Sequence, residues 1–234
     1  MPPSSQRHGA DIAFLHTAAI HIDTFDVLGL EVAPELKLTH VVREDLLAAT
    51  EKVGYVTPAL ALKTREALLA LADGGARVVV CTCSTLGAVA EATNEEAAVP
   101  ILRIDRPMAD LAVLQGHRIG IAACVPATVP NTEALIAESA RAVARDFELE
   151  TFLFDDIWTA FREGRLDDYY QGIATRIADV ARRVDVLVLA QASMAPAAAL
   201  CHNLPVPVLS SPRIGFEAAA RLARRGDTMR RNAR

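Results

Sequence analysis

Short apolar runs alternate with amphipathic stretches along most of the chain. The apolar runs are continuous rather than alternating with polar residues, which is typical of parallel strands covered on both faces. The sequence predicts eight such strands: Ile12–His16, Leu36–Val42, Val78–Cys81, Ile101–Ile104, Ile119–Ala122, Leu149–Phe154, Val186–Ala190 and Val206–Leu209. Helices are expected between them, and this order predicts an α/β fold of doubly wound layers with right-handed crossovers.

Three of the intervening stretches have the spacing of amphipathic helices. The first, Thr57–Ala72, carries regularly spaced leucines and stops before Gly74 and Gly75, a typical C-terminal signal. The stretches Thr132–Arg145 and Gln171–Arg183 have a similar pattern.

The sequence also contains an internal repeat. The stretch ARVVVCTCSTL at 76–86 resembles DVLVLAQASMA at 185–195, which pairs Cys83 with Ala192, 109 residues later. Two further pairs of strands match in the same order: 12–17 with 119–124, and 99–102 with 206–209. Three matches at a nearly constant offset indicate two similar α/β halves.

We therefore expect two Rossmann-like halves, each a doubly wound parallel sheet, related by a pseudo-twofold axis with the active site in the cleft between them. The first half would comprise residues 1–112 and the second residues 113–212, with Leu114–His117 as the connection. Pro212 breaks the chain after the last predicted strand, so a separate helix is expected over residues 213–234.

Composition excludes several classes of function. The chain has 234 residues, 52% hydrophobic and 23% charged, as expected for a globular protein. A formal net charge of −5 argues against nucleic acid as a partner. The sequence shows no signal peptide and no apolar run of membrane-helix length, so we expect a cytoplasmic protein without a membrane partner.

The sequence suggests neither a metal nor a cofactor. Its four cysteines are expected to be free thiols, and their spacing predicts no metal site. No G-x-G-x-x-G motif follows the first predicted strand, and no P-loop is present, which argues strongly against a nicotinamide enzyme.

Polar residues follow one predicted strand at the point where it ends. Cys83, Ser84 and Thr85 come after Val78–Cys81 and before the next helix. Ligands of open α/β sheets bind beyond the carboxyl ends of the strands. A thiol at a helix N-terminus is favoured as thiolate, and the free backbone N–H groups there can hold a carboxylate. The alternative is that Cys83 is an ordinary core residue and Ser84 a helix cap.

The segment from Val80 to Thr85 resembles the Cys-Asn-Thr or Cys-Ser-Thr turn of the aspartate/glutamate racemase superfamily. That group also includes hydantoin racemases, arylmalonate decarboxylases and maleate isomerases. The likeness covers nearly the whole chain, including loops near Thr17 and Thr128 and a second turn near Ala192.

This resemblance implies a cofactor-independent enzyme acting on a small carboxylate substrate. It implies that the helix at 213–234 packs back on the first half, and it suggests a homodimer. In the family two thiols face each other across the substrate; one takes the α-proton and the other returns it on the opposite face. The implied catalytic residue is Cys83. The implied substrate-binding residues are Thr17, Ser84, Thr85, Thr128, Ala192 and Ser193.

The sequence departs from the family at the second turn, where Ala192 matches the second cysteine. Alanine cannot transfer a proton, and the neighbouring Ser193 is a poor acid or base without a partner base. We therefore expect a single-thiol reaction, such as a decarboxylation or an isomerisation, rather than two-base racemisation. The alternative is a degenerate protein that binds a carboxylate without turnover.

Other residues are weaker candidates. His16 and His21 flank the first loop and could tune Cys83, although satisfied loop histidines are the alternative. Tyr55 falls where decarboxylase-like relatives place a tyrosine. Cations for a second substrate carboxylate could come from Arg103, Arg106 or Arg213, and packing is the expected role of Cys124.

Overall fold

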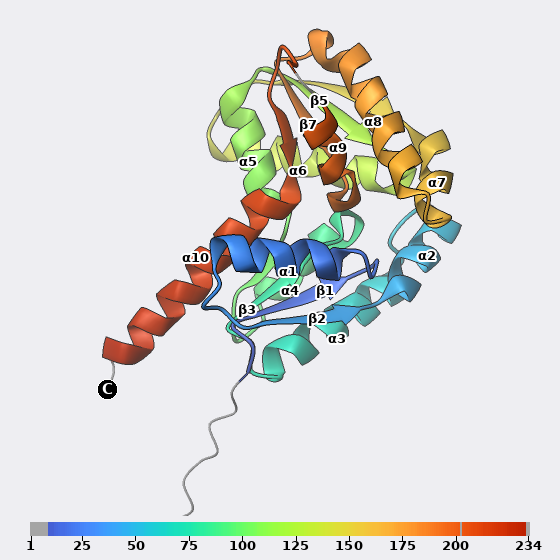
Figure 1. Cartoon of the computed structure of the whole chain (residues 1–234). Coiled ribbons are helices and arrows are strands. Elements are labelled where there is room, and N and C mark those ends of the chain that lie inside the picture. The colour runs from blue at the N-terminus through green and yellow to red at the C-terminus, as the bar shows by residue number, and fades with distance from the viewer. Residues whose placement is uncertain (1–8, 202, 233–234) are drawn as a thin grey trace, which may run out of the picture.

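A computed structural model describes residues 9–201 and 203–232. Its two halves each contain a four-stranded parallel sheet (Figure 1). The first sheet has the spatial order β2-β1-β3-β4, with β1 Ile12–His16, β2 Leu38–Val42, β3 Val78–Cys81 and β4 Ile101–Arg103. The second sheet has the order β6-β5-β7-β8, with β5 Arg118–Ala123, β6 Glu148–Leu153, β7 Val186–Leu189 and β8 Val208–Ser210.

The predicted fold class is confirmed. All eight predicted strands are present, with ends that differ by no more than two residues. The central strands of both sheets are buried throughout or nearly so, which explains their continuous apolar sequences. The identical strand order of the two sheets supports the pseudo-twofold relation inferred from the repeat.

Helices cover both faces of each sheet (Figure 1). In the first half they are α1 His21–Val32, α2 Glu44–Val53, α3 Pro58–Asp73 and α4 Gly87–Asn94, followed by α5 Arg106–Gln115. In the second half they are α6 Val129–Ala142, α7 Trp158–Arg162, α8 Leu166–Val180 and α9 Ala195–Leu200, followed by α10 Ser211–Asn232. None of the described helices is both long enough and apolar enough to span a membrane.

The bounds of α3 follow from local chemistry. The Thr57 hydroxyl accepts a hydrogen bond from the Leu60 N–H at 3.3 Å, which caps the helix before Pro58 at its first position. The helix ends at Asp73, as the glycine pair predicted, and Gly75 adopts a positive φ of 93°.

The two halves exchange their last helices. Buried residues of α5, such as Met108 and Ala112, pack in one cluster with Ile119 and Val188 of the second sheet. Buried residues of α10 pack instead against the first sheet, where Phe216 stacks on Phe14 with ring centroids 6.2 Å apart. Figure 1 shows α10, in red, leaving the second half and running beside α1.

A close backbone approach accompanies this exchange. A Cβ at Gly215 would lie only 2.2 Å from the Ile104 carbonyl oxygen, so a glycine lets α10 settle on the end of β4. The expected boundary after residue 112 falls inside α5, and the expected connection at Leu114–His117 is the end of this helix and the turn that follows it. By packing, the chain changes halves before α5 and again before α10.

Candidate active site

One small cavity lies between the two halves at the carboxyl ends of their strands. Its empty space is about 380 Å³ when the adjoining open solvent is counted, and about 30 Å³ of it admits the centre of a water molecule. The lining residues are Thr17, Ala18, His21, Leu47, Thr82, Cys83, Ser84, Thr85, Val125, Thr128, Trp158, Phe161, Gln191, Ala192 and Ser193. Most of them come from the loops after β1, β3, β5 and β7, the two central strands of each sheet, which is where open α/β sheets bind ligands.

All the residues implied by the family resemblance lie at this cavity. They are Thr17, Cys83, Ser84, Thr85, Thr128, Ala192 and Ser193. All four cysteines fall within the described residues, and Cys83 is the one that lines the cavity. Of the weaker candidates, His21 lines the cavity, whereas Tyr55 is 61% exposed and does not. Cys124 packs in the core of the second half, as expected.

Cys83 occupies the turn between β3 and α4. It has an extended backbone conformation and precedes the short 3₁₀ helix η1, Ser84–Leu86, which leads into α4. Burial raises the pKa of the Cys83 thiol, although hydrogen bonds to its sulfur from the Thr17 hydroxyl and the backbone N–H groups of Leu86 and Thr85 act in the opposite direction. Desolvation outweighs these donors, so the expectation that the helix N-terminus would favour a thiolate is wrong.

The second turn has the same geometry but a different register from the one read from the sequence. Val78 of β3 and Val186 of β7 pair with equivalent residues of the neighbouring strands, Ile12 and Ile119. The 3₁₀ helices that follow begin at Ser84 and at Ala192. The repeat offset in this region is therefore 108 residues, and the pairing of Cys83 with Ala192 is wrong by one position.

The structural counterpart of Cys83 is Gln191. Both residues are extended and directly precede a 3₁₀ helix, with φ and ψ of −94° and 111° for Cys83 and −109° and 141° for Gln191. Ala192 is the counterpart of Ser84. The sequence comparison missed this because the shared serines Ser84 and Ser193 aligned the two turns one residue too far along.

Gln191 is held by the loop after β5. Its Oε1 accepts a hydrogen bond from the Cys124 backbone N–H at 3.0 Å, while its Nε2 is buried and has no partner. The next polar residue, Ser193, bonds to the Tyr169 hydroxyl at 3.0 Å. The two turns therefore present a thiol on one side of the cavity and a carboxamide on the other.

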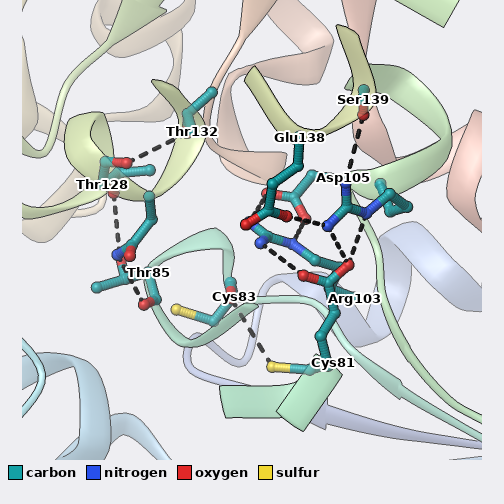
Figure 2. A network of polar contacts seen from close by, with 12 residues as sticks. Cys81, Cys83, Thr85, Arg103, Asp105, Thr128, Thr132, Glu138 and Ser139 are labelled. Carbon is teal, nitrogen blue, oxygen red and sulfur yellow. Dashed lines mark hydrogen bonds and ion pairs between the residues drawn. The ribbon is translucent and has the colours of Figure 1, made fainter. Parts of the chain in front are cut away.

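Hydrogen bonds join the two halves beside the cavity. The Thr85 and Thr128 hydroxyls lie 2.9 Å apart, and Asn131 Nδ2 donates to the Thr85 carbonyl at 3.0 Å. Figure 2 shows this contact beside Cys83, whose thiol points toward Thr85. Thr85 and Thr128 are both at least 97% buried, so their contact between the halves is shielded from solvent.

An ion-pair network lies behind the Cys83 turn (Figure 2). Arg103 donates to Asp105 at 2.7 Å and to Glu91 at 3.2 Å, and Arg106 joins Glu91 of α4 to Glu138 of α6, at 2.6 Å each. A Cβ on Gly87 would lie 2.6 Å from the Arg103 guanidinium, so only a glycine lets this cation pack under the start of α4. Arg103 and Arg106 are therefore committed to carboxylates of the chain and do not line the cavity.

The remaining cation proposed from the sequence is also outside the cavity. Arg213 pairs with Glu31 on the surface. Among the residues that line the cavity there is no Asp, Glu, Lys or Arg. A bound carboxylate would have to be held by hydroxyl, amide and backbone N–H donors.

Two helices cover the mouth of the cavity. Leu47 comes from α2, and Trp158 and Phe161 come from α7. The Trp158 indole N–H donates to Glu51 of α2 at 2.7 Å, and its ring stacks on Phe161 with centroids 4.5 Å apart. This bond joins the halves across the mouth. Nothing in the sequence around Trp158 indicates which half its N–H would reach.

A chain of histidines extends from the cavity wall to the surface. His16 Nδ1 lies 2.8 Å from the hydroxyl of Thr82, which itself donates to the Leu15 carbonyl, and His16 Nε2 lies 2.9 Å from His40 Nδ1. Burial lowers the pKa of His16 to about 3 and that of His21 to about 4. Both rings are therefore neutral at pH 7 and contribute no positive charge beside Cys83.

Comparison with known proteins places this geometry in context. A model of the Asp/Glu/hydantoin racemase family matches residues 36–219. No curated protein sequence matches the chain.

Several solved structures share the fold. A glutamate racemase isoform from Bacillus anthracis is 15% identical with a TM-score of 0.69, over 94% of this chain and 84% of that one. An allantoin racemase from Klebsiella pneumoniae is 15% identical with a TM-score of 0.65, over 92% and 88%. An arylmalonate decarboxylase is 19% identical with a TM-score of 0.57, over 91% of both chains. Identities this low show a common fold and leave the reaction to be argued from the cavity.

Proposed function

Because the chain belongs to the Asp/Glu/hydantoin racemase family, we propose that it is a cofactor-independent enzyme that transfers a proton at the carbon α to a carboxylate through one thiol, Cys83. The observation that carries this proposal is the position of Cys83. It is the one cysteine that lines the cavity between the halves, and hydroxyl and backbone donors surround its sulfur. The same loop can therefore supply a proton and bind an anion.

The raised pKa of Cys83 favours the role of a general acid. A thiol that is protonated at rest can give its proton to a planar enediolate, the species formed when a malonate-type substrate loses carbon dioxide. The electrons of the broken carbon–carbon bond pass into the enediolate and return to bond the proton. The sulfur is left as a thiolate, held by the N–H groups of Thr85 and Leu86 until solvent returns a proton.

The lining residues that come from the second half include no thiol, carboxylate, lysine or histidine. Gln191 stands where a second thiol would be placed by the pseudo-twofold axis, and a carboxamide does not exchange protons with a carbon acid near neutral pH. We therefore favour one-sided protonation, by decarboxylation or isomerisation, over two-base racemisation.

The cavity favours a substrate with an apolar substituent. Leu47, Val125, Trp158 and Phe161 supply its apolar surface, and the lining residues include no cation for a second carboxylate to pair with. Aspartate or glutamate would keep a charged side-chain carboxylate buried without a counter-ion throughout the reaction, which is costly, whereas a malonate-type substrate loses its second carboxylate as carbon dioxide.

A second candidate is a protein that binds a carboxylate without turning it over. The raised pKa of Cys83 supports it, because the resting thiol is a weak nucleophile and a weak base.

One experiment separates the two functions. The protein and its Cys83→Ser variant are incubated in heavy water with both enantiomers of aspartate and glutamate, a 5-substituted hydantoin, maleate and 2-methyl-2-phenylmalonate, and NMR follows each acid. We expect one acid to exchange, isomerise or decarboxylate with the wild type, and a rate at least ~10²-fold lower for the variant. Binding of an acid with no reaction in either protein would instead support the binding protein.

A further inference from the structure

Two unpaired polar atoms belong to residues that line the cavity. Of the side chains that the structure describes, three buried polar atoms lack a hydrogen-bond partner: Ser84 Oγ, Gln191 Nε2 and Ser211 Oγ. Ser84 and Gln191 both line the cavity. Buried polar groups in proteins are nearly always paired, so two orphaned atoms in one cavity indicate places left for the polar atoms of a ligand.

The orientation of the Gln191 amide is fixed by its neighbour. The Cys124 backbone N–H needs an acceptor, and Gln191 Oε1 provides it at 3.0 Å. A flipped amide would set an NH₂ group against this N–H, so the free end must be Nε2 with its two hydrogens. Gln191 therefore offers the cavity a donor and no acceptor.

The place of Gln191 decides which face of a substrate it touches. Cys83 and Gln191 hold equivalent positions on the two pseudo-symmetric turns, and both line the cavity. A planar intermediate bound between the turns would have the thiol on one face and the amide on the side opposite.

We propose that Gln191 binds a carboxylate oxygen of the substrate through Nε2 and stabilises the negative charge that develops there in the enediolate. The amide thereby takes the place of a second acid–base group and confines protonation to the face of Cys83. This role rests on the proposed Cys83 reaction. Donors of this kind, aimed at a developing oxyanion, make large contributions to rate.

Gln191→Glu is the sharpest test. A glutamate keeps an oxygen to accept from the Cys124 N–H, so folding is preserved, but it replaces the Nε2 donor with a second oxygen. Assayed with 2-methyl-2-phenylmalonate at about pH 8, well above the ordinary pKa of glutamate, we expect kcat/KM to fall by at least ~100-fold. The matched control, Gln171→Glu on the exposed face of α8, should stay within ~2-fold of the wild type.

Gln191→Cys gives a gain of function that a folding defect cannot imitate. A thiol at this position would face Cys83, so that one sulfur takes the α-proton of a single enantiomer of 2-phenylpropionate and the other returns a proton on the opposite face. We expect slow racemisation by Gln191→Cys that is absent from the wild type and from the Gln191→Cys, Cys83→Ser double variant.

The possible outcomes separate the two proposals. A wild type that shows no Cys83-dependent reaction with any acid of the panel would overturn the proposed function itself. A Cys83-dependent reaction that Gln191→Glu leaves within ~3-fold of the wild type, with no racemisation by Gln191→Cys, would overturn the role of Gln191 alone.

Discussion

The turns after β3 and β7 occupy equivalent places in two halves of the same topology, yet they differ in chemistry. The first presents Cys83 with donors around its sulfur, and the second presents Gln191 with a free amide. The scaffold is symmetric in strand order, in the 3₁₀ helix after each turn and in the exchange of α5 and α10. A symmetric fold can therefore hold one reactive group and one binding group against the two faces of a ligand.

The support behind the turns is also unequal. On β4 the buried Arg103 pairs with the buried Asp105, whereas the strand register places Ser210 of β8 at the position of Arg103. The first turn therefore has buried charges behind it that the second lacks, and Thr85 of this turn also bonds to Thr128 and Asn131 of the second half.

The largest effect is expected when Arg103 of β4 is replaced by serine, the residue that β8 carries at the equivalent position. Arg103→Ser leaves the Asp105 carboxylate buried without its cation, so the free energy of unfolding should fall by about 3–5 kcal/mol. Urea denaturation measures this change. Arg183→Ser, which removes the exposed pair with Glu150, should cost no more than ~1 kcal/mol. A loss below ~1 kcal/mol for Arg103→Ser would mean that the network does not brace the turn.

His21, the first residue of α1, predicts a pH dependence that the second half does not share, because no histidine of that half lines the cavity. Burial lowers the folded-state pKa of His21 from 6.5 to about 4. Between these two pH values His21 binds a proton in the unfolded chain but not in the folded protein. The free energy of unfolding therefore falls as the pH drops from 6.5 to about 4. The contribution of His21 is about 3 kcal/mol over this range.

His21→Asn tests this dependence. Urea denaturation at pH 7 and at about pH 4.5 should show a smaller loss of stability for His21→Asn than for the wild type. Equal losses for the two proteins would show that His21 is not the group that titrates.

The smallest effect concerns the bond across the mouth of the cavity. Trp158→Phe keeps an aromatic ring against Phe161 but removes the N–H that donates to Glu51. A double-mutant cycle with Glu51→Ala should give a coupling energy of about 1 kcal/mol. A coupling near zero would indicate that α2 and α7 meet by apolar packing alone.

The fold was predictable from the sequence because strands covered on both faces must be apolar throughout. That requirement gave every strand and the two-half arrangement. The packing of α5 on the second sheet was not predictable, since an apolar helix face does not specify which of two similar sheets it covers. The return of α10 to the first half was implied by the family resemblance and not by the sequence pattern. Trp158 and Leu47 were missed as cavity residues for a related reason: their role depends on how the halves meet.

The chemistry was predictable at one turn and misread at the other. The site could be predicted at Cys83, Ser84 and Thr85, because these polar residues directly follow the continuous apolar run of a buried strand. At the second turn, the alignment of Ser84 with Ser193 decided the register, because two apolar strands alone give little positional information. The resulting shift of one residue paired Cys83 with Ala192 instead of Gln191. Side-chain period and strand register decide which residue faces a cavity, and only the paired strands fix that register. The raised pKa of Cys83 was likewise hidden, because it depends on burial by both halves.

The most direct test of the central claim, one thiol acting on one face, is the configuration of the labelled product. The wild type is given 2-methyl-2-phenylmalonate, or the acid of the panel that reacts fastest, in heavy water, and the α-deuterated product is analysed by chiral chromatography and NMR. We expect one deuterium at the α-carbon and a single enantiomer, with product formation lost in Cys83→Ser. A racemic product, or deuterium delivered to both faces at similar rates, would show that a second proton-transferring group acts in the cavity and would contradict this claim.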